Sequence, residues 1–192
     1  VFDKSYDKYD IMNDIMSLGI HRVWKKDLIF WMSPKENKNL IDVASGTGDI
    51  AKLFSKLTNN KSKVLCIDPN KKMLLKGKEK LSNLKNIQWK IGNAENLPVN
   101  DDCYEYYSIS FGLRNTKNIG KSLSEAFRVL KQGGRFFCLE FSKVENENLD
   151  LLYSNYSKFL PLVGKFVLGD SMPYKYLTES IKNFIDQKTL IE

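Results

Sequence analysis

The sequence predicts an α/β protein built on an open, doubly wound, mostly parallel sheet with crossover helices. Two patterns support this fold class. From Asn39 onward, short apolar runs alternate with amphipathic helical windows, as in parallel strands joined by helices. Helical periodicity without strands flanks that core on both sides. With 192 residues, the chain fits a single domain that buries most of its apolar surface in one core.

The first 38 residues are predicted to form a helical cover. Between residues 2 and 33, apolar side chains recur mostly at steps of three and four, and Ser33-Pro34 ends the helical region. The pattern is carried by Ile11, Ile15, Leu18, Val23, Trp24, Leu28 and Trp31.

Residues 39–143 are predicted to form the α/β core. Ligands of such sheets bind beyond the carboxyl ends of the strands, so the loops that follow strands are the expected site. Five strands are expected at 40–44, 63–67, 87–91, 106–110 and 135–141. Helices are expected at 49–58, 71–81 and 119–130, the last closed by Gln132-Gly133-Gly134.

Residues 144–192 are predicted to form a helical segment inserted after the fifth strand, on the substrate side. Residues 149–168 place apolar side chains on one face, interrupted by Pro161 and Gly164, and 174–192 is a further helical window. No closing strand follows, so we expect a domain that is truncated at its C-terminal end. No stretch approaches the roughly 18 uninterrupted apolar residues of a membrane-spanning helix.

Charge and cysteine content limit the classes of partner. The net charge of +7 comes with 26 lysines and 17 asparagines, scattered along the chain. This excess indicates the coding bias of an AT-rich genome; attraction to a membrane surface is the alternative, and no specific nucleic-acid partner is expected. Cys66, Cys103 and Cys138 form no metal-binding or disulfide pattern, so no metal is expected. Because the chain begins at Val1, an upstream targeting segment could have been removed.

A glycine-rich turn follows the first predicted strand. In DVASGTGD, Gly46, Thr47 and Gly48 open the first helix, and a Cβ at either glycine is expected to crowd a ligand. With Ala51 the turn also satisfies the GxGxxA dinucleotide pattern, so the glycines alone do not separate NAD from S-adenosylmethionine.

Carboxylates near the turn favour a cationic ligand. Asp42 lies on the strand four residues before Gly46, where it would repel a pyrophosphate, and Asp49 adds negative charge at the helix N-terminus. S-adenosylmethionine carries an ammonium and a sulfonium instead. Asp68, at the end of the second strand, can accept hydrogen bonds from both ribose hydroxyls, or alternatively cap the helix that begins near Lys71.

A second polar turn follows the third predicted strand. Asn93-Ala94-Glu95 supplies an amide and a small residue that could bracket an adenine edge; the alternative is a plain turn before Leu97-Pro98.

Several long stretches of the chain are distinctive: YDIMNDIMSLGIHRVWK, DVASGTGD, NAENLP, ISFGLRN, FRVLKQGGRFFCLEFSK and YKYLTESI. They resemble the ubiquinone/menaquinone biosynthesis C-methyltransferase family, within the class I S-adenosylmethionine-dependent methyltransferases. Together they span nearly the whole chain. The resemblance implies cofactor contacts at Thr47, Asp68, Asn93, Ala94 and Ser110. Two features depart from the family: Ser45 stands where Gly or Cys is usual, and the family's last segment is absent.

The resemblance also implies methyl transfer to a ring carbon of a polyprenylated quinol. That carbon becomes nucleophilic when an adjacent hydroxyl loses its proton. Arg114, after the fourth strand, could stabilise the phenolate or position a water that takes the proton. Its alternative role is a salt bridge that fixes the loop.

His21, the one histidine, could act as base or quinol ligand, or bond the backbone structurally. Tyr9 and Asn115 are lesser candidates. An apolar enclosure, built from the N-terminal helices and residues 149–168, could admit the polyprenyl tail, although core packing is the simpler role for Trp24, Trp31, Phe159 and Phe166.

The expected location is the matrix face of the mitochondrial inner membrane, as a peripheral protein, with a bacterial cytoplasm as the alternative. A quinone-biosynthesis complex or a homodimer is the expected assembly. Three rival functions stay open: a nucleic-acid methyltransferase, a dehydrogenase and a cofactor-binding scaffold. The loop after the fourth strand, SFGLRN, has neither the Pro-Pro-Tyr nor the Pro-Cys pattern of nucleic-acid methyltransferases.

Overall fold

A computed structural model describes residues 14, 15, 17, 19–142, 156 and 172–191. The chain groups into two compact units, which are described separately: residues 22–140, and residues 1–21 together with 141–192. The predicted N-terminal cover is described mostly from Arg22 onward. That part therefore belongs to the 22–140 unit, which contains the sheet. The division into one domain with three segments stays a prediction.

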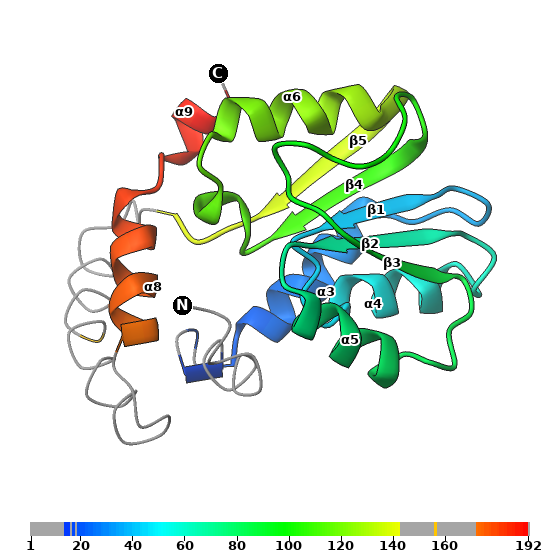
Figure 1. Ribbon diagram of the computed structural model, residues 1–192, viewed down its shortest axis with the longest axis horizontal. Helices are drawn as coiled ribbons and strands as arrows, with labels where there is room; N and C mark the ends of the chain where they lie inside the picture. The colour runs from blue at the N-terminus through cyan, green and yellow to red at the C-terminus, as the bar shows by residue number, and fades with distance from the viewer. Residues whose placement is uncertain (1–13, 16, 18, 143–155, 157–171, 192) are drawn as a thin grey trace. The chain divides into compact units, whose positions relative to one another are not determined.

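The 22–140 unit contains a five-stranded parallel sheet in the order β3-β2-β1-β4-β5 (Figure 1). The strands are β1 (Leu40–Val43), β2 (Val64–Asp68), β3 (Ile87–Ile91), β4 (Tyr104–Ser110) and β5 (Leu130–Leu139). Every residue of β1 and β2 is buried, as expected for central strands covered on both faces. This confirms the predicted fold class.

The last strand begins five residues earlier than predicted. Leu130 pairs with Tyr104, but the next registered pair is Tyr106 with Arg135, so the residues between them form a bulge. Gly133 adopts a φ of +74°, and a Cβ at Gly134 would lie 2.8 Å from the Lys131 carbonyl oxygen. The glycines that suggested the end of a helix therefore shape an irregular strand start instead.

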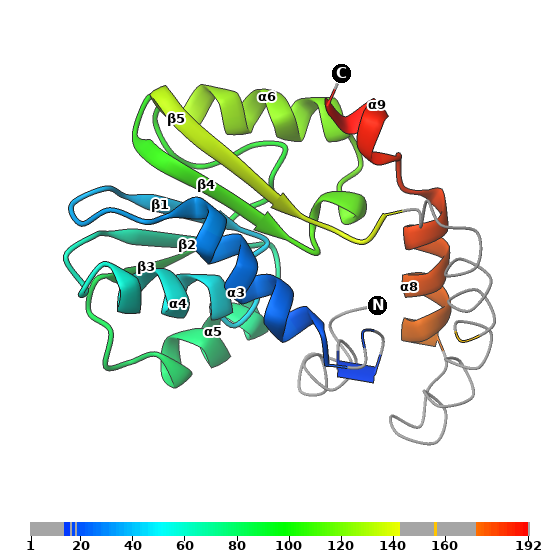
Figure 2. The same ribbon diagram turned by 180° about the vertical axis from the view of Figure 1, so that it is seen from behind.

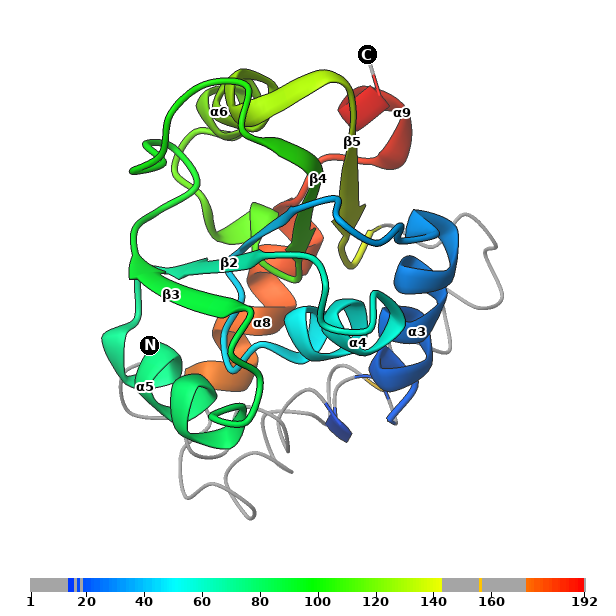
Figure 3. The same ribbon diagram turned by 90° about the vertical axis from the view of Figure 1, so that its right-hand side faces the viewer.

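Helices cover both faces of the sheet (Figures 2 and 3). On one face lie α3 (His21–Met32), α4 (Asp49–Leu57) and α5 (Lys71–Lys80), and on the other lies α6 (Ile119–Val129). All four agree with predicted helical regions to within two residues, apart from the start of α3, before which most residues lie outside the description. A short 3-10 helix, η2 (Leu113–Asn115), follows β4.

The buried stripe of α3 differs from the predicted one. Leu28, Ile29 and Met32 pack into the core, whereas Trp31 is 75% exposed and Val23 53%. Core packing is therefore the wrong role for Trp31, because its side chain lies on the face of the helix turned away from Leu28, Ile29 and Met32. Phe159 and Phe166 lie outside the described residues.

The second unit contains α8 (Met172–Asn183) and α9 (Gln187–Ile191). The sequence predicted one window over 174–192, but the Asp186 carboxylate accepts hydrogen bonds from the backbone N–H and the hydroxyl of Thr189. Asp186 thus caps a new helix and separates the two. The predicted helical segment 149–168 lies outside the described residues except for Tyr156, and none of the described helices is long and apolar enough to cross a membrane.

Candidate active site

The candidate site lies where the order of the strands reverses. From β1 the chain passes through α4 to β2 on one side, and it later returns to place β4 on the other side of β1. Ligands of doubly wound sheets bind beyond the carboxyl ends of the strands at this switch point. The loops after β1 and β4 are therefore the central parts of the site.

The loop after β1 is a tight turn held by its own backbone. The N–H of Gly48 donates to the Ser45 carbonyl at 2.9 Å, and the N–H of Ser45 donates to the Ile67 carbonyl at 3.1 Å. The N–H of Gly46 donates to the Asp68 carboxylate at 2.9 Å. These bonds join the turn to the end of β2, so Asp68 helps to shape the turn.

The two glycines of this turn have different roles. A Cβ at Gly46, whose φ is +55°, would meet only the flexible end of Met73, at 3.3 Å. A Cβ at Gly48, whose φ is +81°, would lie 2.6 Å from the Trp89 ring. A Cβ at Gly48 would thus crowd the indole of β3, so the packing of the fold requires glycine here, and its contact with a ligand stays a prediction. Gly46 remains the position at which close approach by a ligand is expected.

Gly112 is a structural requirement that the sequence prediction missed. Its φ is −121°, yet a Cβ there would lie 2.3 Å from the Cβ of Ala44. The loop after β4 can therefore approach the loop after β1 only with glycine at this position. The glycine inside SFGLRN was the available signal, but its contact partner lies 68 positions earlier.

We expect Gly112→Ala to push these two loops apart. The clash is between two methyl carbons close to the backbone, so overpacking should lower the free energy of unfolding by about 1–3 kcal/mol. It should also weaken binding of S-adenosylmethionine, the cofactor that the sequence resemblance implies. Urea unfolding measures the first effect and calorimetry the second, with Gly120→Ala as the control because a Cβ there meets nothing nearer than 3.4 Å.

Asp42 is a buried carboxylate at the centre of the sheet, 1% exposed. Its Oδ1 accepts a hydrogen bond from the Ser108 hydroxyl of β4 at 2.7 Å, while Oδ2 has no donor among the described residues. Burial raises the pKa of Asp42 from 3.8 to about 7, against the lowering effects of the Ser108 hydrogen bond and the charge of Lys25. A buried acceptor of this kind calls for a donor or a positive charge.

Asp49, at the start of α4, is bonded by two lysines. Lys25 Nζ lies 2.8 Å from Oδ2, and Lys80 Nζ lies 3.0 Å from Oδ1. Although burial raises the pKa of Asp49, the two ammonium groups hold it well below its usual range. Two lysines that are distant in the chain therefore balance the negative charge that Asp49 places at the start of α4.

Asp68 is bonded by backbone on both carboxylate oxygens. Oδ2 accepts from Gly46 and Oδ1 from Asn70, at 2.9 and 2.8 Å. Burial raises the pKa of Asp68, and these two hydrogen bonds lower it in part. The cap of α5 is Asn70, whose side chain accepts from the Lys72 and Met73 N–H groups, so the alternative role of Asp68 as that cap is wrong. Each carboxylate oxygen keeps capacity for a further donor.

Asn93 and Ala94 lie in a turn directly after β3. The Asn93 Oδ1 accepts from the Glu95 N–H at 3.0 Å, and Ala94 is buried. Glu95 in turn accepts from the N–H groups of Lys117 and Asn118, just before α6. A local hydrogen bond thus holds the turn, and Glu95 attaches it to the residues just before α6.

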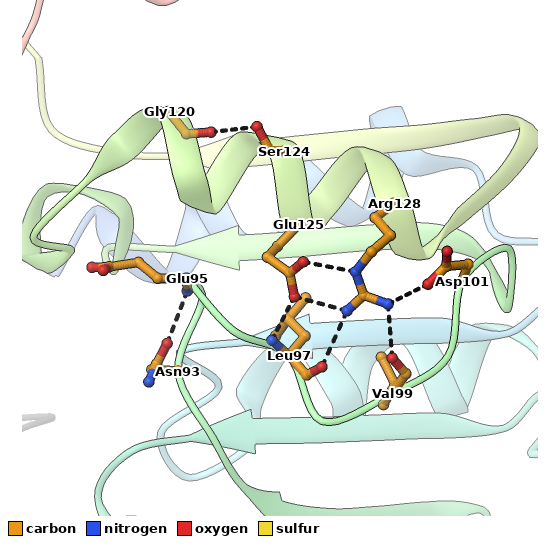
Figure 4. Close-up of polar contacts among 9 residues, drawn as sticks. All are labelled: Asn93, Glu95, Leu97, Val99, Asp101, Gly120, Ser124, Glu125 and Arg128. Carbon is orange, nitrogen blue, oxygen red and sulfur yellow. Dashed lines mark hydrogen bonds and ion pairs between the residues drawn. The ribbon is translucent and has the colours of Figure 1, made fainter.

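Arg128 of α6 holds the continuation of this loop (Figure 4). Its guanidinium donates to the carbonyls of Leu97 and Val99 at 3.1 and 2.9 Å, and to Asp101 at 2.6 Å. Glu125, paired with Arg128 at 2.7 Å, accepts from the Leu97 N–H. The segment that follows Asn93 and Ala94 is therefore fixed to α6 by one fork of charge-assisted hydrogen bonds.

Arg128→Ala is expected to raise the Kd for S-adenosylmethionine, the methyl donor that the sequence resemblance implies, about 10-fold, because the loop carrying Asn93 and Ala94 loses its attachment to α6. Turnover at saturating donor should change much less. Arg128→Lys should recover only part of the affinity, since an ammonium cannot reach two carbonyls and a carboxylate in one plane. Steady-state kinetics over a range of donor concentrations measure both parameters, and an unchanged KM for the donor would contradict this role.

The loop after β4 carries Ser110, Arg114 and Asn115. Ser110 ends the strand, and its hydroxyl has no partner among the described residues. The Arg114 guanidinium forms an ion pair with Glu140, and the two side chains are 1% and 4% exposed. The Arg114 N–H also donates to Glu140, at 3.3 Å, and the Asn115 amide donates to the Phe111 carbonyl at 3.2 Å. Arg114 therefore forms a salt bridge with Glu140 that fixes the loop, which was the alternative to a catalytic role.

His21 belongs to the other unit and is 1% exposed. Its Nε2 lies 2.8 Å from the Asp14 carboxylate, and its backbone N–H donates to the Ser17 hydroxyl at 3.1 Å. A carboxylate on Nε2 fixes the ring orientation. Tyr9 lies outside the described residues.

The residues around the β1 turn suit a cationic ligand. Asp42 offers a buried oxygen without a described donor, Gly46 has no side chain beside the end of Met73, and Ser110 adds a hydroxyl. Asp68 can accept from a diol. Among the described residues, no group of three His, Cys, Asp or Glu side chains could hold a metal ion.

Comparison with known proteins places the chain in a family. The family model described as ubiE/COQ5 methyltransferase matches residues 1–192. A Brucella canis protein named ubiquinone/menaquinone biosynthesis C-methyltransferase UbiE is 45% identical, over 98% of this chain and 72% of the relative. A Gallus gallus protein named 2-methoxy-6-polyprenyl-1,4-benzoquinol methylase, mitochondrial, is 42% identical, over 99% of this chain and 73% of the relative.

Solved structures show the same fold at lower identity. A Methanococcus maripaludis protein described as a putative S-adenosyl-L-methionine-dependent methyltransferase matches with a TM-score of 0.63 at 18% identity, over 93% of this chain and 83% of its own. An Aquifex aeolicus SAM-dependent methyltransferase matches with a TM-score of 0.58 at 21% identity, over 69% of this chain and 78% of its own. By its full-length match to the family model and its relatives above 40% identity, the chain belongs to the ubiE/COQ5 methyltransferase family.

Proposed function

We propose that this protein transfers a methyl group from S-adenosylmethionine to a ring carbon of a polyprenylated benzoquinol or naphthoquinol, in ubiquinone or menaquinone biosynthesis. The names of the relatives support the substrate class. The observation that carries the choice of donor is the buried Asp42 carboxylate, whose Oδ2 meets no described hydrogen-bond donor. Such a group attracts a cationic donor and repels a diphosphate.

S-adenosylmethionine, when bound, supplies an electrophilic methyl group on a sulfonium. Asp42, Gly46, Thr47 and Gly48 would hold it at the β1 turn, where Asp42 provides negative charge. The ribose hydroxyls would donate to Asp68, which keeps lone pairs beyond its two backbone bonds. At the remaining edges of the site, we propose contacts from Asn93, Ala94 and Ser110.

Arg114 is our candidate for the proton step. The quinol carbon becomes nucleophilic when the neighbouring hydroxyl ionises, and a guanidinium favours that phenolate or orients a water that accepts the proton. Glu140 holds Arg114 in place while it shares the positive charge. His21, as base or as quinol ligand, is a second candidate, and Asn115 is a lesser one.

The relatives include both bacterial and mitochondrial proteins. We propose a peripheral location on the matrix face of the mitochondrial inner membrane, with a bacterial cytoplasm as the alternative. There the enzyme would meet its polyprenyl quinol, alone, as a homodimer or in a quinone-biosynthesis complex. Fractionation of the source cells, followed by detection of the protein in the membrane and soluble fractions, tests this location.

The deciding experiment incubates full-length protein with methyl-labelled S-adenosylmethionine and a short-chain benzoquinol or naphthoquinol. Label on a ring carbon, located by mass spectrometry or NMR, supports the proposal, and the preferred ring identifies the pathway. If the donor binds but no methyl reaches either ring, the protein acts as a scaffold. If NADH raises the melting temperature and S-adenosylmethionine does not, the choice of donor is wrong.

A further inference from the structure

Lys25 of α3 reaches the start of α4 from a helix that precedes the whole sheet. Its Nζ donates to Asp49 Oδ2 at 2.8 Å, and its side chain is only 11% exposed. Leu28, Ile29 and Met32 of the same helix are buried in the core, so the backbone that carries Lys25 is firmly placed. A lysine held this way keeps its ammonium at a defined point beside the β1 turn.

Asp49 has a second cation, so Lys25 is not needed merely to neutralise it. Lys80, at the end of α5, bonds Asp49 Oδ1 at 3.0 Å and lies 3.5 Å from the Thr47 hydroxyl. Its side chain is 38% exposed, so water screens it more than Lys25. Two ammonium groups therefore bind the one carboxylate of Asp49. Lys25 is the more buried of the two, so its positive charge is less screened and also acts on other groups nearby.

The charge of Lys25 also acts on Asp42. Groups on every neighbouring element interact with this buried carboxylate. Ser108 of β4 donates a hydrogen bond to it. The other interactions are electrostatic and involve Cys66 and Asp68 on β2, Tyr107 on β4, Asp49 on α4 and Lys25 on α3. Asp49 and Asp68 disfavour a negative charge on Asp42, whereas Lys25 favours it. Lys80 is the more exposed of the two lysines, so water screens its charge more strongly than that of Lys25. The two lysines, similar around Asp49, thus differ in their effect on Asp42.

We propose that Lys25 is a positioning residue for the methyl-donor site, which holds the start of α4 through Asp49 and supplies positive charge to the buried Asp42 carboxylate. The inference rests on the proposed function, since it assumes that Asp42 receives a cationic donor. Because an ionised Asp42 is required for that role, removal of Lys25 should move the pH range in which the donor binds, and not only its affinity.

The test measures the Kd for S-adenosylmethionine by calorimetry between pH 6 and 9, with full-length wild type, Lys25→Met, Lys25→Arg and Lys80→Met. In the wild type, affinity should fall as the pH drops through the pKa of Asp42. Lys25→Met should move that midpoint upward by about 1 pH unit, so that affinity is about 10-fold weaker near pH 7 and recovers toward pH 9. Lys25→Arg should keep the wild-type midpoint.

Lys80→Met is the matched control, because it removes the other, more exposed ammonium from Asp49. Its midpoint should match the wild type even where its affinity is lower. Equal midpoints in Lys25→Met and the wild type, or equal shifts in the two lysine variants, would overturn the inference while leaving the proposed function intact. If the wild type binds no S-adenosylmethionine at any pH, the proposed function fails, and this inference fails with it.

Discussion

Asp42→Asn should make the fold more stable at pH 8 and the methyl donor much weaker in binding. The substitution keeps an oxygen to accept from Ser108 and removes a buried negative charge. The pKa of Asp42 is about 7 in the folded protein, whereas that of an unburied Asp side chain is 3.8. At about 1.4 kcal/mol per unit, the ionised carboxylate costs the fold roughly 4 kcal/mol above pH 7.

The sign of the pH dependence follows from the raised pKa. Between pH 4 and 7 the unfolded chain has lost the Asp42 proton while the folded chain retains it, so wild-type stability falls as the pH rises through this window. Asp49 acts in the opposite direction: its pKa is lowered, so its contribution is present above pH 4 and is lost in more acidic solution. The two carboxylates therefore change the free energy of unfolding in different pH ranges, Asp42 between pH 4 and 7 and Asp49 below pH 4.

The asparagine amide leaves an N–H₂ group in place of Oδ2, which offsets about 1–3 kcal/mol of the gain. A net stabilisation of about 2 kcal/mol at pH 8 is expected, or roughly 6 °C in Tm, with little or none at pH 4. Binding of S-adenosylmethionine should weaken about 100-fold, the effect of losing a desolvated charge partner. Thermal melts at both pH values and calorimetry measure these effects. A less stable variant at pH 8, or one with wild-type affinity, would contradict this account of Asp42.

Arg114→Ala should be among the most destabilising substitutions in the 22–140 unit. It leaves Glu140 buried without its ion-pair partner, which costs about 3–5 kcal/mol. A fall in Tm of about 10 °C is expected. Arg114→Lys keeps the charge but not the planar fork and should fall between the alanine variant and the wild type. Chemical unfolding gives these values directly.

Turnover separates the two roles of Arg114. If the guanidinium stabilises the developing phenolate, Arg114→Lys should lower kcat about 100-fold with little change in the Kd for S-adenosylmethionine. Glu140→Gln, which keeps the guanidinium, should retain most of kcat even where stability falls. If Arg114 only fixes the loop, these two variants will lose turnover in step with stability. The double variant Arg114→Met with Glu140→Leu should then recover both, because no buried charge is left alone.

Most of the fold could be predicted from the sequence. Strand positions β1, β2 and β3 were predicted to within one residue, because buried apolar runs and the turns between them are local features. The prediction was wrong where backbone pairing outweighed a local signal. The glycines before Arg135 indicated a turn, but the register between β4 and β5 absorbs them in a bulge.

Individual residues of the candidate site were predicted from the sequence, but their ion-pair partners were not. Asp42 and the β1 turn follow from the order of residues after one strand. Nothing near Asp49 indicates that Lys25 and Lys80 neutralise it, and nothing near Arg114 points to Glu140. Arg128 was absent from the prediction because the loop residues that it binds lie 27 to 31 residues earlier in the chain.

By itself, the sequence determined the fold class, the position of the glycine turn after β1 and the residue types that surround it, since periodicity and turn chemistry depend on neighbours along the chain. The tertiary structure decided which charges are neutralised, which glycine meets a side chain and which carboxylate stays buried without a described donor. Those outcomes depend on distances between segments that meet only when the sheet forms. Electrostatic energy and steric overlap are set by such distances, not by separation in sequence.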